Sequence, residues 1–150
     1  MENNFLFKKF KTTDSDLYNQ TINLRNDILR KPLGKQYSQH DLLIEKNNQF
    51  YGILLSQKLI ATLSTYELGK STIKIVSFAV DSDFQKQGIG SLLLKQVIAD
   101  YQKSGYDEVN LTARASAHEF YLKNGFHDIS GPFKNDYLNI TDYDMQFFMR

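Results

Sequence analysis

The stretch Val80-Asp81-Ser82-Asp83-Phe84-Gln85-Lys86-Gln87-Gly88-Ile89-Gly90-Ser91 joins a β-like run over residues 73–80 to a helix-like run over residues 88–102. Two glycines at such a junction let the backbone approach a ligand closely. The free N–H groups of the first helical turn point outward, where the helix dipole favours an anion. The stretch therefore predicts a cradle for a phosphate group, although an ordinary turn between a strand and a helix could carry the same glycines.

Two common phosphate-binding motifs do not fit this loop. A P-loop needs Gly-x-x-x-x-Gly-Lys followed by Ser or Thr, and that run is absent. A Rossmann turn needs a third glycine three residues after Gly90, where this chain has Leu93. The spacing that remains, Gln85-x-x-Gly88-x-Gly90, resembles the pyrophosphate loop of the GNAT family of N-acetyltransferases.

A second segment strengthens this resemblance. Residues 117–126, Ala-His-Glu-Phe-Tyr-Leu-Lys-Asn-Gly-Phe, resemble the GNAT segment A-x-x-F-Y-x-K-x-G-F that closes the cofactor site. A helix and a strand separate the two segments, as the family requires. Residues 24–34 also look like the first helix and turn of one bacterial GNAT subgroup. The resemblance covers most of the chain and is strongest from residue 73 to residue 126.

The periodicity of apolar residues predicts the element order β-α-α-β-β-β-α-β-α-β-β. The resemblance implies an α/β (α+β) fold with a mixed, mostly antiparallel central sheet flanked by helices. Residues Thr12, Thr13, Asp14 and Ser15 offer several N-caps for the first helix, and with Thr13 as the cap Asp16 comes close to forming a capping box. We expect Pro32-Leu33-Gly34 to end that helix and Ser38-Gln39-His40-Asp41 to cap the second. Predicted strands cover residues 5–11, 49–55, 59–67, 71–80, 108–113, 126–129 and 143–149, and predicted later helices cover 88–102 and 115–123.

Composition narrows the class of protein. The 150 residues are 41% hydrophobic and 23% charged, which indicates a globular chain rather than a disordered one. A net charge of +1 gives no electrostatic support to nucleic-acid binding. There is no cysteine, and His40, His118 and His127 do not have the spacing of metal ligands, so we expect neither disulfides nor a metal.

Targeting signals are not evident in the sequence. Residues 1–9 have no basic region followed by an apolar stretch, so we expect no signal peptide. No apolar run approaches the ~18 residues of a membrane span. We therefore expect one domain over residues 1–150, located in the cytoplasm, with no membrane partner.

The resemblance implies that acetyl-CoA is the acyl donor. Backbone N–H groups of residues 85–91 would hold the pyrophosphate, with hydrogen bonds or charge added by the Gln85 and Lys86 side chains. The Ser91 hydroxyl could also reach a phosphate, or could simply start the helix. The strand before the loop would lend backbone groups to the pantetheine. The expected cofactor-binding residues are Phe78, Ala79, Val80, Gln85, Lys86, Gln87, Gly88, Ile89, Gly90, Ser91, Phe120, Tyr121 and Lys123.

The resemblance also implies two catalytic groups. The backbone N–H of Phe78 would polarise the thioester carbonyl, and a donor of this kind is worth roughly 3–4 kcal/mol in the transition state. Tyr121 would donate a proton to the departing thiolate; the alternative is that it only packs beside Phe120. Lys123 would meet the cofactor phosphates or the negative end of its own helix.

The general base is less evident. Many family members have a carboxylate on the central strand, where this chain offers Lys74 and Ser77 and no acid. Asp142 and Glu67 are candidates from other strands, although either acid could be a solvated surface group, and a water chain is a further alternative. The subgroup often has Ile-Pro-His where this chain has Ile140-Thr141-Asp142, so no histidine base is expected there.

The sequence therefore predicts an N-acetyltransferase that moves an acetyl group from acetyl-CoA to a primary amine of a small molecule or peptide, by direct attack in a ternary complex. The absence of cysteine agrees with direct transfer. The alternatives are a non-catalytic acyl-CoA sensor and a nucleotide-binding domain of another fold. Late strands in the family often pair across a homodimer. The basic residues Arg25, Arg30, Lys31 and Lys35 could suit an anionic acceptor or form a solvated helix surface.

Overall fold

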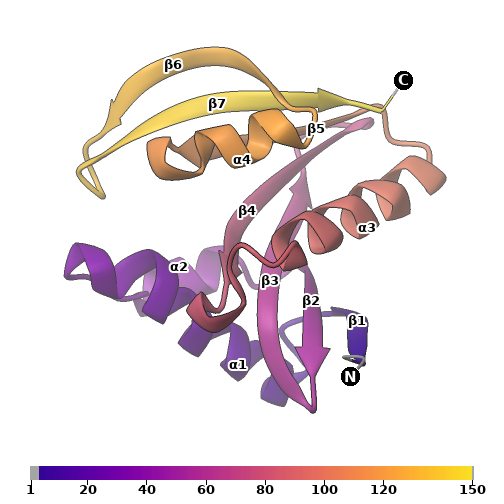
Figure 1. Cartoon of the computed structure of the whole chain (residues 1–150), viewed down its shortest axis with the longest axis vertical. Coiled ribbons are helices and arrows are strands. Elements are labelled where there is room, and N and C mark those ends of the chain that lie inside the picture. The colour runs from indigo at the N-terminus through magenta and orange to yellow at the C-terminus, as the bar shows by residue number, and fades with distance from the viewer. Residues whose placement is uncertain (1–3, 150) are drawn as a thin grey trace. The chain divides into compact units, whose positions relative to one another are not determined.

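The computed structural model describes residues 4–149 and confirms the predicted mixed fold (Figure 1). Seven strands form a mostly antiparallel sheet in the order β1-β2-β3-β4-β5-β7-β6. The strands are β1 Phe5–Phe10, β2 Gln49–Leu55, β3 Lys58–Glu67, β4 Thr72–Val80, β5 Glu108–Arg114, β6 His127–Asn135 and β7 Ile140–Phe148. The α-helices are α1 Ser15–Arg25, α2 Gln39–Ile44, α3 Ile89–Lys103 and α4 His118–Lys123.

The chain divides into two compact units. The first unit runs up to Tyr66 and resumes over Ser77–Val97, and the second unit comprises Glu67–Val76 and the chain from Ile98 onward. Both β4 and α3 pass from one unit into the other. The first unit holds the loop that follows β4, and the second holds α4 and the last strands.

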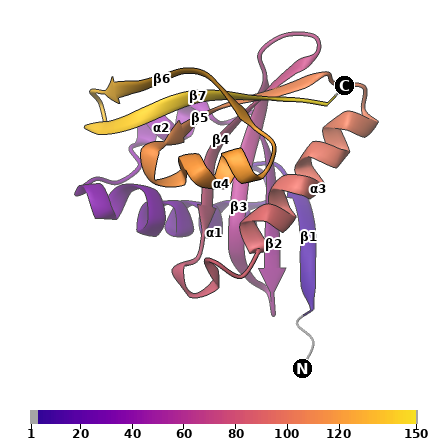
Figure 2. The ribbon, with the colours of Figure 1, turned by 45° about the horizontal axis from the view of Figure 1, so that its top comes forward.

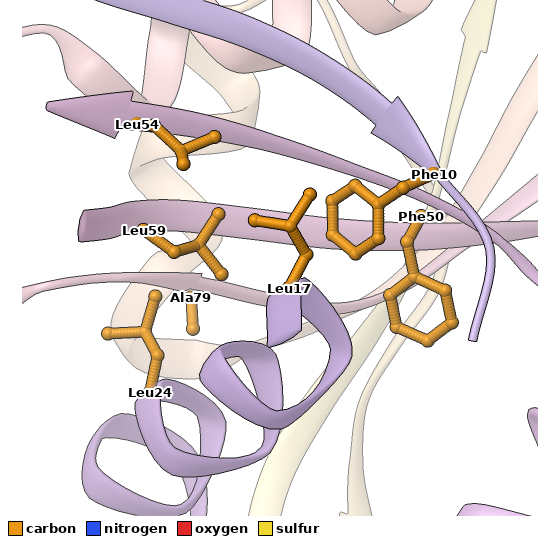
Figure 3. Close-up of a cluster of buried hydrophobic side chains, with 7 residues drawn as sticks. All are labelled: Phe10, Leu17, Leu24, Phe50, Leu54, Leu59 and Ala79. Carbon is orange, nitrogen blue, oxygen red and sulfur yellow. The ribbon is translucent and has the colours of Figure 1, made fainter. Parts of the chain in front are cut away.

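In the first unit, α1 packs its apolar side chains onto the strands. Leu17 and Leu24 are buried and point from the helix toward the sheet (Figure 3). The packing partners on the strands are the buried side chains Phe10, Phe50, Leu54, Leu59 and Ala79. Burying a large apolar side chain stabilises the folded state by about 1.5–3 kcal/mol, so this cluster anchors the end of β4.

The first helix begins at one of the four candidate N-caps. The N-cap is Asp14, whose side chain accepts the Leu17 N–H, so Thr13 and Asp16 do not form a capping box. The cap of α2 is as predicted: Ser38 and Asp41 form a capping box in which each side chain accepts the other residue's backbone N–H. After α1 the chain continues as a π-helical turn, Asn26–Arg30, and a 3-10 turn, Lys31–Leu33, which ends at the left-handed Gly34.

The second unit contains a parallel pair and an antiparallel hairpin. Residues Thr72–Ile75 of β4 pair with β5 in parallel, and β7 pairs with β5 and β6 in antiparallel register. The strands β6 and β7 run side by side, next to α4 (Figure 2). Alternation puts Val109, Leu111 and Ala113 on the buried face of β5 and leaves polar side chains on the other face.

The predicted late strands are too short. The structure extends β6 to Asn135, through Gly131 and Pro132, and starts β7 at Ile140. Proline is tolerated here because β6 is an edge strand and its pairing with β7 is irregular between Ser130 and Phe133. In α3, Ile89, Leu93 and Val97 are buried, whereas the Leu92 side chain is exposed.

Candidate active site

The loop between β4 and α3 is held by its own side chains. The Gln85 amide donates to the Val80 carbonyl at 2.9 Å, and the Gln87 amide donates to the Asp83 carbonyl at 3.0 Å. Asp81 accepts the Asp83 N–H at 2.9 Å. The Gln85 side chain, which was predicted to contact the cofactor, thus stabilises the loop itself. The backbone N–H groups remain the main donors for a phosphate.

Gly88 gives this loop its shape. Its φ is +82°, a left-handed conformation that favours glycine, and a Cβ placed there would meet no atom within 4 Å. Lys86 is also left-handed, with a φ of 65°. The Gly88 carbonyl accepts the Leu92 N–H, so Ile89, Gly90 and Ser91 form the first turn of α3. Because the first turn of a helix favours an anion and a Cβ at Gly88 would meet no atom within 4 Å, the loop fits a pyrophosphate.

The end of β4 lies directly before the loop. Ala79 is 2% exposed and belongs to the core, whereas Phe78 and Val80 are half-buried. The Asp81 N–H donates to the Ile60 carbonyl at 2.8 Å, which ties the strand end to β3. The Gln85–Val80 hydrogen bond therefore brings the predicted pantetheine and pyrophosphate segments together within the first unit.

Tyr121, in the second unit, is buried among aromatic rings. Its ring centroid is 5.1 Å from that of Phe120 and 5.6 Å from that of Phe126. Burial raises the pKa of the Tyr121 phenol, and the positive charge of Arg114 opposes this shift only in part. The phenol therefore keeps its proton at neutral pH, as a general acid must. Lys123 is exposed in the last turn of α4.

The two candidate bases have different surroundings. Asp142 is 3% exposed; one carboxylate oxygen accepts from the Asn135 amide at 2.9 Å, and the other is buried with no hydrogen-bond partner. Glu67 accepts a hydrogen bond from the Tyr106 hydroxyl, which raises the pKa of Tyr106 to about 12. Asp142 thus has a buried oxygen without a hydrogen-bond partner, whereas Glu67 is exposed and binds Tyr106 through one of its two oxygens.

The first part of the central strand carries a lysine in place of an acid. Lys74 donates to the Thr112 hydroxyl at 3.0 Å, and Thr112 donates to Asp144 at 2.8 Å. Burial lowers the pKa of Lys74, and the charge of Asp144 opposes this effect. A second oxygen of Asp144 accepts from Ser130, so both oxygens of this carboxylate have partners.

The histidines of the second unit pack against aromatic rings. The His118 ring stacks on the Tyr143 ring with 3.7 Å between the ring centroids, and the His118 Nε2 lies 2.7 Å from an Asp128 oxygen. The His127 ring stacks on Phe148. Within residues 4–149, no group of three or more His, Cys, Asp or Glu side chains could hold a metal ion.

The basic segment after α1 is not uniformly solvated. Arg25, which sequence reasoning placed on a basic surface, is fully buried and forms two hydrogen bonds to Glu45, at 2.7 and 2.8 Å. Lys31 pairs with Asp27 at the surface. The Arg25–Glu45 pair could not be predicted from the sequence, because its members are 20 residues apart and belong to different helical segments.

Comparison with known proteins identifies the family of this chain. The family described as "Acetyltransferase (GNAT) domain" matches residues 19–147, so the chain belongs to the GNAT acetyltransferase family. Members of this family transfer an acyl group from acyl-CoA, and the chain is therefore an acyl-CoA-dependent acyltransferase. No curated protein sequence matches the chain.

Solved structures share the fold at low sequence identity. A candidate N-acetyltransferase from Lactobacillus plantarum has a TM-score of 0.85 at 15% identity, over 99% of this chain and 100% of that one. The ribosomal-protein-S18-alanine N-acetyltransferase from Escherichia coli has a TM-score of 0.79 at 18% identity, over 97% of this chain and 94% of that one. PaiA N-acetyltransferase from Thermoplasma acidophilum, solved with coenzyme A, has a TM-score of 0.73 at 17% identity, over 97% of this chain and 99% of that one. The fold excludes a nucleotide-binding domain of another architecture.

Within the described part of the chain, none of the helices has the length and apolar character needed to cross a membrane.

Proposed function

We propose that the protein is an N-acetyltransferase that moves the acetyl group of acetyl-CoA to a primary amine of a small molecule or peptide. It acts as one cytoplasmic domain over residues 1–150, without a metal, and its late strands could pair in a homodimer. The observation that carries the proposal is the left-handed Gly88 directly before α3, where a Cβ would meet no atom within 4 Å, next to a helix N-terminus that favours an anion.

Acetyl-CoA, when bound, supplies the activated thioester. The N–H groups of residues 85–91 bind the pyrophosphate, Gly88 and Gly90 allow close approach, and Phe78, Ala79 and Val80 orient the pantetheine through their backbone groups. The N–H of Phe78 polarises the acyl carbonyl, where negative charge develops as the amine attacks. Attack is direct, because the chain has no cysteine to carry an acyl group.

Two protons must move during the reaction. The amine loses one, and the departing thiolate gains one. Tyr121 is the proton donor, and its raised pKa, caused by burial, keeps the phenol protonated across the working range. Water or a peripheral carboxylate accepts the amine proton. The two candidate carboxylates are Asp142, which has a buried oxygen without a hydrogen-bond partner, and the exposed Glu67, which binds Tyr106 through one oxygen.

The experiment compares glycines at the two ends of α3. Gly88 and Gly105 both have a left-handed φ and open space at the Cβ position, so valine strains the backbone at each in a similar way. Gly88→Val should weaken coenzyme A binding at least tenfold, about 1.4 kcal/mol, while Gly105→Val leaves it unchanged.

Titration calorimetry of coenzyme A, with circular dichroism as the folding control, decides the matter. Equal affinities in Gly88→Val and Gly105→Val would remove the phosphate cradle from the proposal. Thiol release from acetyl-CoA with a panel of amines then separates the enzyme from the non-catalytic acyl-CoA sensor. Coenzyme A binding without turnover on any amine would favour the sensor.

A further inference from the structure

Arg30 differs from the other basic residues of its segment. It is half-buried at the end of the π-helical turn Asn26–Arg30, and among residues 4–149 no carboxylate pairs with it. Its NH1 donates only to the neighbouring Leu29 carbonyl, at 3.4 Å, and its Nε is buried with no hydrogen-bond partner. Arg25 and Lys31, by contrast, have Glu45 and Asp27. The terminal nitrogens of the Arg30 guanidinium therefore keep donors that a ligand could satisfy, whereas the Nε is out of a ligand's reach.

Tyr37 holds this guanidinium in place. The Arg30 Cζ lies 4.2 Å from the centroid of the Tyr37 ring. The Tyr37 N–H donates to the Asn26 side chain at 2.7 Å, and its hydroxyl is 3.2 Å from the Ser77 hydroxyl, so both ends of the residue are fixed. A guanidinium that lies over an aromatic ring directs the N–H groups along its edge outward from the ring. Two such neighbouring N–H groups match the two oxygens of a carboxylate.

The same contacts place Arg30 near the reacting end of β4. Ser77 directly precedes Phe78, whose N–H is proposed to polarise the acyl carbonyl. Through the Tyr37 ring, the Arg30 guanidinium lies within roughly 10 Å of the Ser77 hydroxyl. The Ser77 φ of 57° is left-handed, a conformation that a strand residue other than glycine rarely adopts and that is often kept for function. The π-helical turn is a second irregularity of this kind.

The net charge around the Tyr37 ring indicates which ligand would bind there. Arg25 lies on the same Tyr37 ring, with its Cζ 4.7 Å from the ring centroid, and its charge is neutralised by Glu45. Arg30, by contrast, contributes one positive charge without a counterion. One such charge matches a carboxylate, while a phosphate dianion would call for more. A hydrogen-bonded pair with a charged group contributes about 1.5–3 kcal/mol.

We infer that the acceptor is an amine that also bears a carboxylate, and that Arg30 binds the carboxylate while the amine faces the acyl group. This inference rests on the proposed function. It makes Arg30 a residue that determines specificity, with Tyr37 as the residue that positions it.

The test uses matched acceptors and matched variants. The acceptors are ω-amino acids of three to six carbons, their carboxamides and their phosphonates. The variants are Arg30→Met, which keeps an apolar stem against Tyr37 and removes the charge, and Lys31→Met, which removes the neighbouring exposed charge. The wild type should prefer each acid over its amide at least tenfold in kcat/KM. Arg30→Met should lose at least tenfold on the acids, mainly through KM, and little on the amides, while Lys31→Met behaves as the wild type.

Three results would overturn the inference: equal use of acid and amide by the wild type, equal losses on both in Arg30→Met, or a preference for the phosphonate. A merely structural Arg30 would give equal losses together with lower stability, which urea unfolding of both variants reveals.

Calorimetry of the N-acetylated ω-amino acids separates this inference from the proposed function, because these products need no turnover to bind. Binding of the acids but not the amides, lost in Arg30→Met, supports the carboxylate site even if no amine is acetylated, in which case the proposed function fails alone. Absence of any such difference in binding would overturn the carboxylate site even if amines are acetylated.

Discussion

Two buried charged side chains, one in each unit, differ in their hydrogen bonds. Arg25, in the first unit, is fully buried, and its guanidinium donates to both Glu45 oxygens and to the Thr21 carbonyl and hydroxyl. Asp142, in the second unit, is nearly as buried, yet only one of its oxygens accepts a hydrogen bond, from Asn135. Both groups lost their water on folding, but every nitrogen of the Arg25 guanidinium has a partner, whereas one Asp142 oxygen has none.

The difference distinguishes a structural ion pair from a carboxylate that is proposed to act in the reaction. An unpartnered buried acceptor costs about 1–3 kcal/mol, so a folded protein that keeps one has a use for it or carries a defect. The Arg25–Glu45 pair links α1 to the C-cap of α2, and Tyr18 donates a further hydrogen bond to Glu45 at 2.6 Å. This network fixes the helical segment that leads to Arg30. Asp142, by contrast, sits opposite Arg114 on β5 with an oxygen ready to accept a donor.

The largest effect is expected from the satisfied pair. Glu45→Gln keeps the shape of the side chain and leaves the Arg25 charge buried without a counterion. Removing one partner of a buried ion pair typically costs 3–5 kcal/mol. The free energy of unfolding from urea titration should therefore fall by about that amount.

Asp27→Asn is the matched control for this prediction, because it removes the partner of the exposed Lys31 and should cost less than about 1 kcal/mol. A loss from Glu45→Gln as small as that of the control would show that the Arg25 network is not structural, and would break the contrast with Asp142.

These two groups also show how far the sequence could be read. The loop at Gly88 could be predicted, because its glycines and the flanking strand and helix lie within a dozen residues and the site is made by the backbone. The environments of Arg25 and Asp142 could not, because Glu45 and Arg114 are distant in the chain and strand register decides which side chains meet. The same limit shortened the predicted β6, whose edge position alone allows Gly131 and Pro132 inside a strand.

The next effect concerns a buried group whose proton is proposed to move. Tyr121→Phe keeps the ring contacts with Phe120 and Phe126 and removes only the hydroxyl. Turnover should fall roughly tenfold to a thousandfold, the range of a positioned general acid, with acetyl-CoA affinity nearly unchanged. Because burial raises the pKa of Tyr121, wild-type turnover should show no loss from phenol ionisation up to about pH 10.

Steady-state kinetics over pH 6 to 10 with the best acceptor checks both statements about Tyr121. Wild-type turnover in Tyr121→Phe would make this residue a packing group, like Phe120 beside it.

The smallest effect is expected at the half-satisfied carboxylate. Asp142→Asn and Glu67→Gln should each lower kcat/KM for the amine less than about a hundredfold, the lower end for a positioned base. An alkyl amine has a pKa of about 10.4, so its neutral form is scarce at pH 7 and the wild-type rate should climb with pH toward that value. Asp144→Asn is the control on the same strand, because both Asp144 oxygens have partners.

The Asp142 and Asp144 variants should move stability and rate in opposite ways. Asp142→Asn removes a charge with an unpartnered oxygen and keeps an acceptor for Asn135, so its free energy of unfolding should be unchanged or higher while its rate falls. Asp144→Asn should lose stability and keep its rate. A wild-type plateau that begins near pH 6 to 7 and disappears in Asp142→Asn would show a dedicated base in place of water. Lower stability with an unchanged rate in Asp142→Asn would instead make Asp142 a structural residue. The contrast between Arg25 and Asp142 would then not reflect a difference in function.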